Sequence, residues 1–346
     1  MIEQAAALTE VGAGLQVAPN GARVLDALGV AVPSVPGRAV RLIDGPTGRP
    51  VVAMPLREPF LLVHRADLIE ALAAAARGAG ARLLFGTVVE GVGDTGVTLR
   101  SPEGHRVDLA FDRLVGADGA RGPSQATVAG AAPPAFTGQV AWRATVPLDR
   151  PWPEETQVHV GPGRHLVLYP LRGGTLLNLV AVREQAEWVA EGWSQAGDPD
   201  EMRAAFAGYT DTGVRAVLDR VRSVHLWGLM GHGARPRWRR GGVVLIGDAA
   251  HPTLPFLAQG ANLALEDAWT LAAMWDDPAA WEAARRPRVE RALREAAANA
   301  RNYHLAGARR AVAHAALRAV GAVAPSLLAR RYDWLYGFDP VASSSR

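Results

Sequence analysis

The residues with the clearest chemical meaning follow a short apolar run, Val-Val-Leu-Ile at 243–246, which has a glycine on each side. Such a run is typical of a buried strand in an α/β sheet, and Asp248 falls at its carboxyl end, where open α/β sheets bind ligands. After a loop with two prolines, Gly260, Ala261 and Asn262 begin a segment with apolar residues at helical spacing. A carboxylate beside an open helix N-terminus can hold a ligand with hydroxyls and a partly negative edge. The plain alternative is an ordinary strand-loop-helix joint in which the aspartate is a cap.

A second set of polar residues lies on predicted strands. His165 and Tyr169 belong to one strand-like segment, and residues two apart on a strand point to the same face. We therefore expect both on one side, either as substrate contacts or catalytic groups in one pocket, or as ordinary residues of a sheet surface. Arg143 can hold a substrate carboxylate through two hydrogen bonds, or form a salt bridge within the sheet. His251, beside the Asp248 loop, can act as a general base or orient that loop.

Composition excludes several kinds of site. The chain has no cysteine and no lysine, which rules out thiol nucleophiles, disulfides, thiolate metal sites and lysine Schiff bases. No two histidines fall at metal-ligand spacing with a carboxylate partner, so we expect no metal. All 37 basic residues are arginines, scattered along a chain of net charge +3, which does not indicate a nucleic-acid surface.

The elements that must position these residues alternate along the chain. We expect a helix from Asn20, a hairpin within 40–58 and a strand over 82–92. Residues 136–226 are rich in strand-like segments, and alanine- and arginine-rich helical segments occupy the C-terminal part. No apolar run approaches the roughly 20 residues that span a bilayer, and the first residues do not resemble a signal peptide. We therefore expect a cytoplasmic protein.

The sequence GDAAHPTLPFLAQGANLALEDA resembles the second FAD signature of the single-component flavoprotein aromatic hydroxylases, the family of salicylate and hydroxybenzoate monooxygenases. The resemblance implies that Asp248 binds the ribityl or ribose hydroxyls of FAD. It also implies that Gly260, Ala261 and Asn262 present backbone N–H groups to the pyrimidine edge of the flavin. Reduced flavin is negative at that edge, and a helix N-terminus carries about half a positive charge. Pro252 is implied to stiffen the wall beside the flavin ring.

Other parts of the chain resemble the same family. Arg65 precedes a predicted helix, at a position where the family has an arginine that contacts FAD. Asp118 lies in an Asp-Gly pair that resembles the family's middle signature, which is associated with FAD and reduced nicotinamide. Val89 matches a position beside the adenine, and Glu3 matches the acidic residue that binds the adenosine ribose. The plain alternatives are a structural arginine at a helix start and a tight Asp-Gly turn.

The chain departs from the family pattern in two places. A G-x-G-x-x-G turn should precede the acidic residue by roughly 20 residues, but Glu3 lies at the very start. The Gly-Ala-Gly at 12–14 fails the motif because Val17 takes the place of the last glycine. Gly122 and Gln125 stand where the family has a serine and an arginine, which weakens the match to the nicotinamide-docking motif. An internal start codon would explain the missing turn, and a real loss would leave a remnant.

The resemblance implies an α/β fold in which a Rossmann-like FAD-binding domain, truncated at its N-terminus, carries an inserted β-sheet substrate domain and C-terminal helices. The first part of the FAD-binding domain is expected over 1–135, with the hairpin at 40–58 on the substrate side. The substrate domain is expected over 136–226, the second part of the FAD-binding domain over 227–275, and the helical region over 276–346.

The implied activity is that of a flavoprotein monooxygenase, which hydroxylates a small phenolic or heteroaromatic acid with NAD(P)H and O2 on bound FAD. The expected partners are small molecules, and a homodimer is compatible with the sequence. Two alternatives stay open. One is a non-hydroxylating flavin oxidoreductase of the same fold, and the other is a truncated remnant that cannot hold FAD and is not an enzyme.

Overall fold

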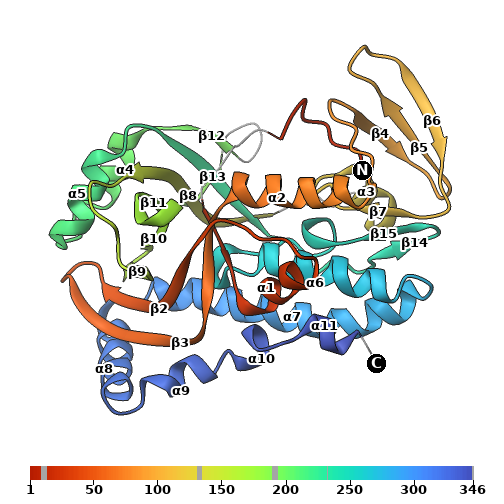
Figure 1. The fold of residues 1–346 in the computed structure, drawn as a ribbon. Coiled ribbons are helices and arrows are strands. Elements are labelled where there is room, and N and C mark those ends of the chain that lie inside the picture. Colours follow the sequence, from red (N-terminus) through yellow and green to blue (C-terminus); the bar gives the residue numbers. More distant parts are fainter. Residues whose placement is uncertain (9–13, 131–134, 189–193, 232, 345–346) are drawn as a thin grey trace.

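The computed structural model describes residues 1–8, 14–130, 135–188, 194–231 and 233–344 (Figure 1). Its largest element is a nine-stranded sheet in the order β1-β3-β2-β9-β10-β11-β8-β13-β12. β2 runs parallel to β9, and the other neighbouring strands are antiparallel. The strands of this sheet are β1 (Gly14–Val17), β2 (Ser34–Asp44), β3 (Arg49–His64), β8 (Ala135–Pro147), β9 (Glu155–Gly161), β10 (Arg164–Leu171), β11 (Leu176–Glu184), β12 (Ser194–Gly197) and β13 (Val224–Gly231).

The two faces of this sheet meet different surroundings, because successive side chains on a strand point to opposite sides. On β10, Leu166 and Leu168 are fully buried in a core shared with the helices on one face. His165, Val167 and Tyr169 face the other way and line a cavity, so the prediction that His165 and Tyr169 share a side is confirmed. The helices on the core side are α4 (Pro199–Ala205) and α5 (Thr212–Arg220).

The expected hairpin is present as β2 and β3, and it joins the large sheet beside β9. The turn lies at 45–48, and the two long strands form the curved ribbon at the left of Figure 1. Phe60 and Leu62 of β3 are buried against Tyr169 of β10, so the hairpin packs over the cavity face. Residues 34–64 therefore belong with the strands of the expected substrate domain.

Two small three-stranded sheets complete the β-structure. In one, β15 (Val243–Leu245) is central, parallel to β7 (Leu114–Gly116) and antiparallel to β14 (Arg239–Arg240). This places the apolar run before Asp248 on a fully buried strand, as predicted. The other sheet, β4 (Val88–Val92), β5 (Gly96–Arg100) and β6 (Arg106–Ala110), projects from the body at the upper right of Figure 1.

The expected strand over 82–92 is wrong in its first half. Gly86 has a φ of +65°, a conformation that breaks an extended strand, and β4 begins after it. Before this turn, Leu84 forms a parallel bridge with Ile2, and the Glu3 amide donates to the Leu84 carbonyl at 2.8 Å. The chain start is thus held beside this segment by backbone hydrogen bonds.

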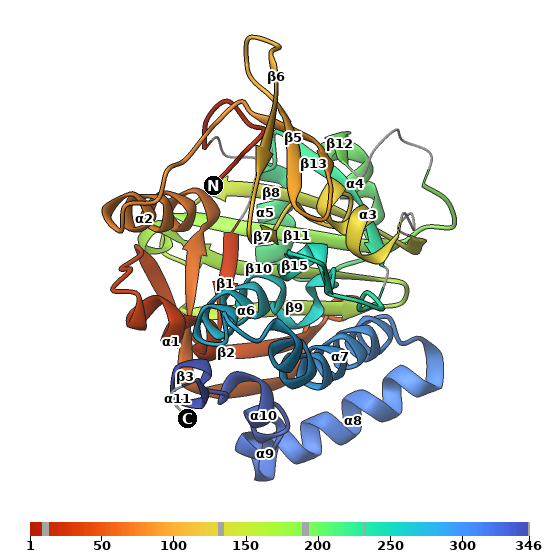
Figure 2. The ribbon, with the colours of Figure 1, turned by 90° about the vertical axis from the view of Figure 1, so that its right-hand side faces the viewer.

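Helices enclose the cavity face of the large sheet, and Figure 2 shows α6 and α7 crossing in front of its strands. α1 packs against α6, while α8 and α9 pack along β3. Within the described ranges, none of the helices has the length and apolar character needed to cross a membrane. The helices not yet given are α1 (Pro19–Ala27), α2 (Arg65–Gly78), α3 (Pro123–Ala129), α6 (Gly260–Ala273), α7 (Pro278–Tyr303), α8 (Gly307–Val323), α9 (Pro325–Arg330), α10 (Asp333–Tyr336) and α11 (Pro340–Ser343), with short 3-10 turns at Arg172–Gly174, Gly247–Ala249 and Pro255–Leu257.

Candidate functional site

A cavity of about 990 Å³ lies between the large sheet and the helices. The end of β15, the start of α6, the hairpin strands and the C-terminal helices all contribute to its wall. The residues predicted from sequence that line it are Arg65, Arg143, His165, Tyr169, Asp248, Gly260 and Ala261. Segments far apart in the chain therefore bring these side chains and backbone groups to one space.

Asp248 reaches the cavity because the chain turns sharply at Gly247. Gly247 has a φ of +56°, and a Cβ there would lie 3.1 Å from the Cβ of Ala264 on α6, so a larger residue would be strained. Asp248 is accessible from the cavity, although many protein atoms lie around its carboxyl group. Burial raises its pKa, while His251, the Thr253 amide and Arg65 act in the opposite direction.

The start of α6 also opens onto the cavity. No side chain caps this helix, and a Cβ placed on Gly260 would meet no atom within 4 Å. The first N–H groups of the helix are therefore accessible at the end where the helix dipole is positive. Asn262 does not line the cavity. It is buried, with its amide nitrogen donating to the carbonyls of Gln16 (3.1 Å) and Ala258 (2.6 Å) and its oxygen accepting from the Ala18 amide.

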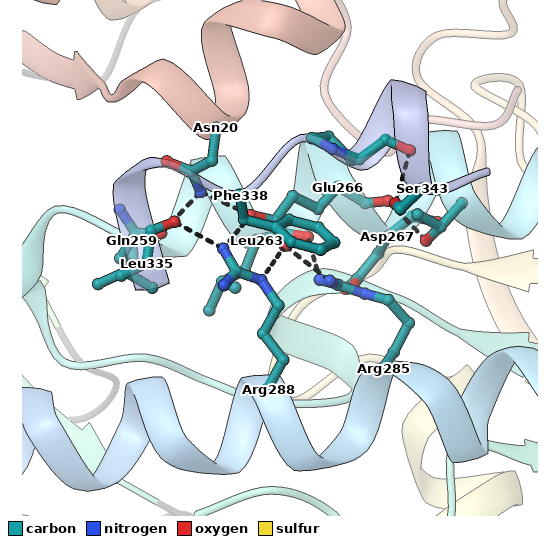
Figure 3. A network of polar contacts seen from close by, with 12 residues as sticks. Asn20, Gln259, Leu263, Glu266, Asp267, Arg285, Arg288, Leu335, Phe338 and Ser343 are labelled. Carbon is teal, nitrogen blue, oxygen red and sulfur yellow. Dashed lines mark hydrogen bonds and ion pairs between the residues drawn. The ribbon is translucent and has the colours of Figure 1, made fainter. Parts of the chain in front are cut away.

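A buried network of ion pairs and hydrogen bonds connects α6 to α1 and α7 (Figure 3). Arg285 of α7 donates to Asp267 at 2.8 Å and to Glu266 at 2.6 Å, and Arg288 donates to Glu266 at 2.7 Å. Asn20 of α1 also donates to Glu266, at 2.6 Å. Figure 3 shows Asn20 of α1 and the two arginines of α7 pointing toward the carboxylates of α6. Because each buried charge has opposite charges in contact, the network can hold the helix start in one position.

His251 belongs to this network rather than to the cavity wall. Its Nε2 lies 2.5 Å from Oδ2 of Asp267, which also accepts from the Gly247 amide at 3.0 Å. Of the two roles left open by the sequence, this contact favours holding the loop. Pro252 does not line the cavity either, whereas its neighbours Thr253 and Pro255 do.

Arg143 forms no salt bridge with any residue that the structure describes. Its neighbour on one side is the ring of Trp227, with the guanidinium carbon 5.5 Å from the ring centre, and its Nε is buried without a hydrogen-bond partner. The residue borders the cavity, but protein atoms enclose the guanidinium. Desolvation lowers its pKa, with a further contribution from Arg65, while Tyr169 opposes the change. The structure thus presents an unpaired cation to the cavity.

The remaining predicted residues differ in whether they line the cavity. Arg65 begins α2 and lines the cavity. Glu3 accepts a hydrogen bond from the Ala5 amide at 2.8 Å, and Val89 lies on β4 opposite Leu99; neither lines the cavity.

Asp118 makes a local turn. Its carboxylate accepts from the amide and hydroxyl of Ser124 near the start of α3, while Ala117 and Gly119 line the cavity in its place. Asp118 packs closely over Gly122: a Cβ there would lie 1.9 Å from the Asp118 carboxyl carbon, so a larger residue would displace this carboxylate.

The sequence of this chain is similar to a family model for FAD binding and to known monooxygenases and hydroxylases. A family model described as "FAD binding domain" matches residues 57–302, more than half of the chain. The chain belongs to the FAD-dependent aromatic hydroxylases. It is 35% identical to 3-amino-4-hydroxybenzoate 2-monooxygenase of Streptomyces cremeus, over 88% of this chain and 81% of that protein. It is 31% identical to 3-hydroxybenzoate 6-hydroxylase of Klebsiella oxytoca, over 98% of this chain and 90% of that protein.

The structure is also similar to solved structures of flavin hydroxylases. A solved salicylate hydroxylase, in complex with substrate, superposes with a TM-score of 0.77 at 24% identity, covering 96% of this chain and 90% of that one. The α/β architecture with a large sheet beside an FAD-binding unit is thus the fold of this family of flavin hydroxylases.

FAD is the cofactor of this family, and the residues of the cavity fit its flavin end. Asp248 offers an acceptor for hydroxyls, and Gly260 leaves open space at an uncapped helix start. Both features suit a ring edge that becomes negative on reduction and that is joined to a hydroxylated chain.

Sequence reasoning missed the aromatic wall supplied by the C-terminal part of the chain. Tyr303 at the end of α7, together with Tyr332 and Tyr336, lines the cavity, and Phe60 packs edge-on against Tyr336 with ring centres 4.9 Å apart. The spacing of Tyr332 and Tyr336 by one helical turn was the available signal, because residues four apart share a helix face.

Proposed function

We propose that this chain hydroxylates a small phenolic acid, using FAD, NAD(P)H and O2, and that Arg143 holds the carboxylate of the substrate. The supporting observation is the unpaired, enclosed guanidinium in a cavity with a largely apolar and aromatic wall. A buried charge without a partner is costly, and a carboxylate would match the planar guanidinium with two hydrogen bonds.

The names of the relatives support the same class of substrate. Those relatives are named for hydroxybenzoates or salicylate, which carry a carboxylate and a phenol on one ring. A heteroaromatic acid is the second candidate, because Arg143 would recognise its carboxylate equally well. The ring itself would pack against Val180 and Val182 of β11 and against Tyr336.

In this proposal, one group of cavity residues binds the cofactor and another binds the substrate. Asp248, with the backbone N–H groups from Gly260 to Asn262, would hold the flavin end of FAD, and Arg65 would contact it from the start of α2. The reduced cofactor supplies the chemistry of oxygen activation.

On the substrate side, His165 would take the phenol proton, and Tyr169 would orient the ring from the same face of β10. Burial raises the pKa of Tyr169, which keeps its hydroxyl protonated and able to donate. The loop 251–257 would exclude water, since Phe256 and Leu257 are buried beside the cavity.

The remaining sequence-based expectations stay part of this proposal. The FAD-binding segments would lie over 1–135 and 227–275, around a substrate domain over 136–226. Glu3, Val89 and Asp118 would contact the rest of FAD. The protein would be a homodimer in the cytoplasm. Loss of FAD affinity in Glu3→Ala and Asp118→Ala variants would support those contacts.

The decisive experiment is to purify the full chain, add FAD, and follow NADH and NADPH consumption with 3-hydroxybenzoate, salicylate and 3-amino-4-hydroxybenzoate. We expect one acid to stimulate consumption, with one atom from labelled O2 appearing in the product. Stimulated consumption without labelled product would favour a non-hydroxylating flavin oxidoreductase. A protein that holds no FAD at micromolar concentration would contradict the proposal.

A further inference from the structure

Three side chains form a continuous hydrogen-bonded path from the cavity to the protein surface. Nδ1 of His165 lies 2.8 Å from Nε2 of His304, and Nδ1 of His304 lies 2.9 Å from Oε1 of Glu184. His165 lines the cavity, while the side chain of Glu184 is 58% exposed. The side chain of His304 between them is 2% exposed, so water reaches the path from the Glu184 end.

We propose that His304 and Glu184 are a proton relay that connects His165, and through it the phenol of the substrate, to solvent. The proposal rests on the proposed function, in which His165 receives the phenol proton. It adds a specific exit route and two residues that act through His165 without touching the substrate.

Burial explains why His165 needs such a route. The rings of Tyr303 and Phe256 lie with centres 5.1 and 5.4 Å from its own, and its side chain has almost no exposed surface. Desolvation holds the pKa of His165 well below its usual range, and His304 lowers it further. An isolated His165 would therefore be a weak base, but it does not have to keep the proton if a neighbour accepts one at the same time.

The contacts define which nitrogen carries each proton. A carboxylate accepts hydrogen bonds, so Nδ1 of His304 donates to Glu184, and Nε2 of His304 accepts from Nδ1 of His165. Nε2 of His165 is then the acceptor available to the cavity. Both histidines are neutral Nδ1–H tautomers in the resting protein.

Each transfer balances. The phenol O–H bond breaks and leaves its electron pair on oxygen, while an N–H bond forms at Nε2 of His165. The Nδ1–H proton of His165 moves to Nε2 of His304, and the Nδ1–H proton of His304 moves to the Glu184 carboxylate, which releases a proton to water. The reverse sequence returns a proton to the product and restores both tautomers. No buried imidazolium has to accumulate at either position.

The charges around the path favour neutral histidines. Desolvation lowers the pKa of His304; Glu184 opposes this through its hydrogen bond and charge, and Arg164 adds to the lowering. Tyr303, from α7, faces His165, and burial raises the pKa of that phenol, so it stays neutral. Among the described residues, Glu184 and Arg164 are thus the charged groups that act on the pKa of His304, and the side chain of Glu184 is exposed to solvent.

The first test uses the full chain without substrate and measures the 15N shifts of its histidine rings. We expect Nδ1–H tautomers for His165 and His304, with the signals assigned from their loss in H165Q and H304Q variants. Glu184→Gln should keep both tautomers, because the amide oxygen still accepts from His304. An Nε2–H tautomer at either histidine would overturn the relay.

The second test measures proton release in the FAD-loaded protein, with 3-hydroxybenzoate as the probe and a pH indicator in stopped flow. Glu184→Gln and His304→Gln should slow release at least tenfold at neutral pH, with FAD affinity and KM within twofold of the unmodified protein. The deficit should shrink as pH approaches the phenol pKa of about 10. Glu201→Gln, an exposed carboxylate paired with Arg183, is the matched control and should have no effect.

Unchanged release in both variants would overturn the relay, even if the protein hydroxylates the probe. Conversely, a protein that holds FAD but hydroxylates none of the three acids would fail the proposed function. The tautomer measurement decides the relay in that case as well, because it needs no substrate.

Discussion

At the scale of single residues, the pKa of a buried charged group depends on whether the group has partners of opposite charge. Desolvation alone would raise the pKa of Asp267, but His251, Arg285 and the Gly247 amide hold it well below its usual range. Arg143 has no such support, and its pKa is lowered. We therefore assign Asp267 a structural role, and we expect Arg143 to bind the anionic group of a ligand.

Replacing Arg143 with methionine tests this difference. The loss of two charge-assisted hydrogen bonds, together worth about 3 kcal/mol, should raise KM for the hydroxybenzoate substrate roughly 100-fold. The variant should also be more resistant to urea, because an unpaired buried charge is removed. Steady-state kinetics and urea unfolding would measure both, with Arg183→Met on the neighbouring strand as control. A less stable variant with unchanged KM would show that Arg143 is structural.

Asp248 gives a second prediction at this scale, directed at the cofactor. Asp248→Ala removes an acceptor that borders the cavity, which should raise the Kd for FAD roughly ten- to 100-fold, the equivalent of about 1.5–3 kcal/mol. Titration of the apoprotein with FAD, followed by flavin fluorescence, would measure the change. The exposed Asp276, replaced in the same way, should leave the Kd unchanged. Equal Kd values for the two variants would remove Asp248 from the cofactor site.

At the scale of elements, α6 has an open start and a firmly held body. No side chain caps its first turn, yet Glu266 and Asp267 tie it to α7 through Arg285. A helix start left without a cap loses stability unless a ligand or another contact compensates. The network supplies that compensation on the buried side and leaves the cavity side free for a ligand.

Arg285→Leu should therefore destabilise the protein by about 3–5 kcal/mol, because it leaves two carboxylates buried with fewer partners. Arg294→Leu, on the exposed side of the same helix and 70% exposed, should change the free energy of unfolding by less than about 0.5 kcal/mol. Urea unfolding of both variants measures the difference. Similar small losses in the two variants would show that the network contributes little net stability.

At the scale of the whole molecule, several buried histidines make stability depend on pH. Burial lowers the pKa of His159 to about 4, with Asp211 acting weakly against it, and burial also lowers the pKa of His165. The unfolded chain has histidines with a pKa near 6.5, so it binds protons that the folded protein does not. Stability from this source is complete above about pH 6.5 and is lost as pH falls toward 4.

For His159 alone, the loss between pH 6.5 and 4 amounts to at most about 3 kcal/mol. His159→Asn should therefore flatten the fall of the unfolding free energy over this range, measured by urea unfolding at several pH values. His105→Asn, at an exposed site, should reproduce the slope of the unmodified protein. An unchanged slope in the His159 variant would contradict the assignment.

The sequence identified most of the elements because their local patterns were strong. The β15 run, the α6 start and the β2–β3 hairpin formed where periodicity and turn residues predicted them. The strand over 82–92 was wrong in part because apolar content extends through Gly86, while the backbone turns there. Periodicity also showed that His165 and Tyr169 share a face of one strand. It did not show whether other elements pack over that face and enclose a cavity there.

What the sequence determined by itself was the family: the Gly247-Asp248 pair and the Gly260-Ala261-Asn262 helix start are particular residues at fixed, local spacings. The tertiary structure decided how single polar side chains are used, because that depends on contacts between distant segments. His251 is bonded to Asp267, Arg143 lacks a partner among the described residues, and His165 meets His304 from a helix far along the chain. No local pattern encodes such contacts, since the free energy of a buried polar group depends on which atoms surround it.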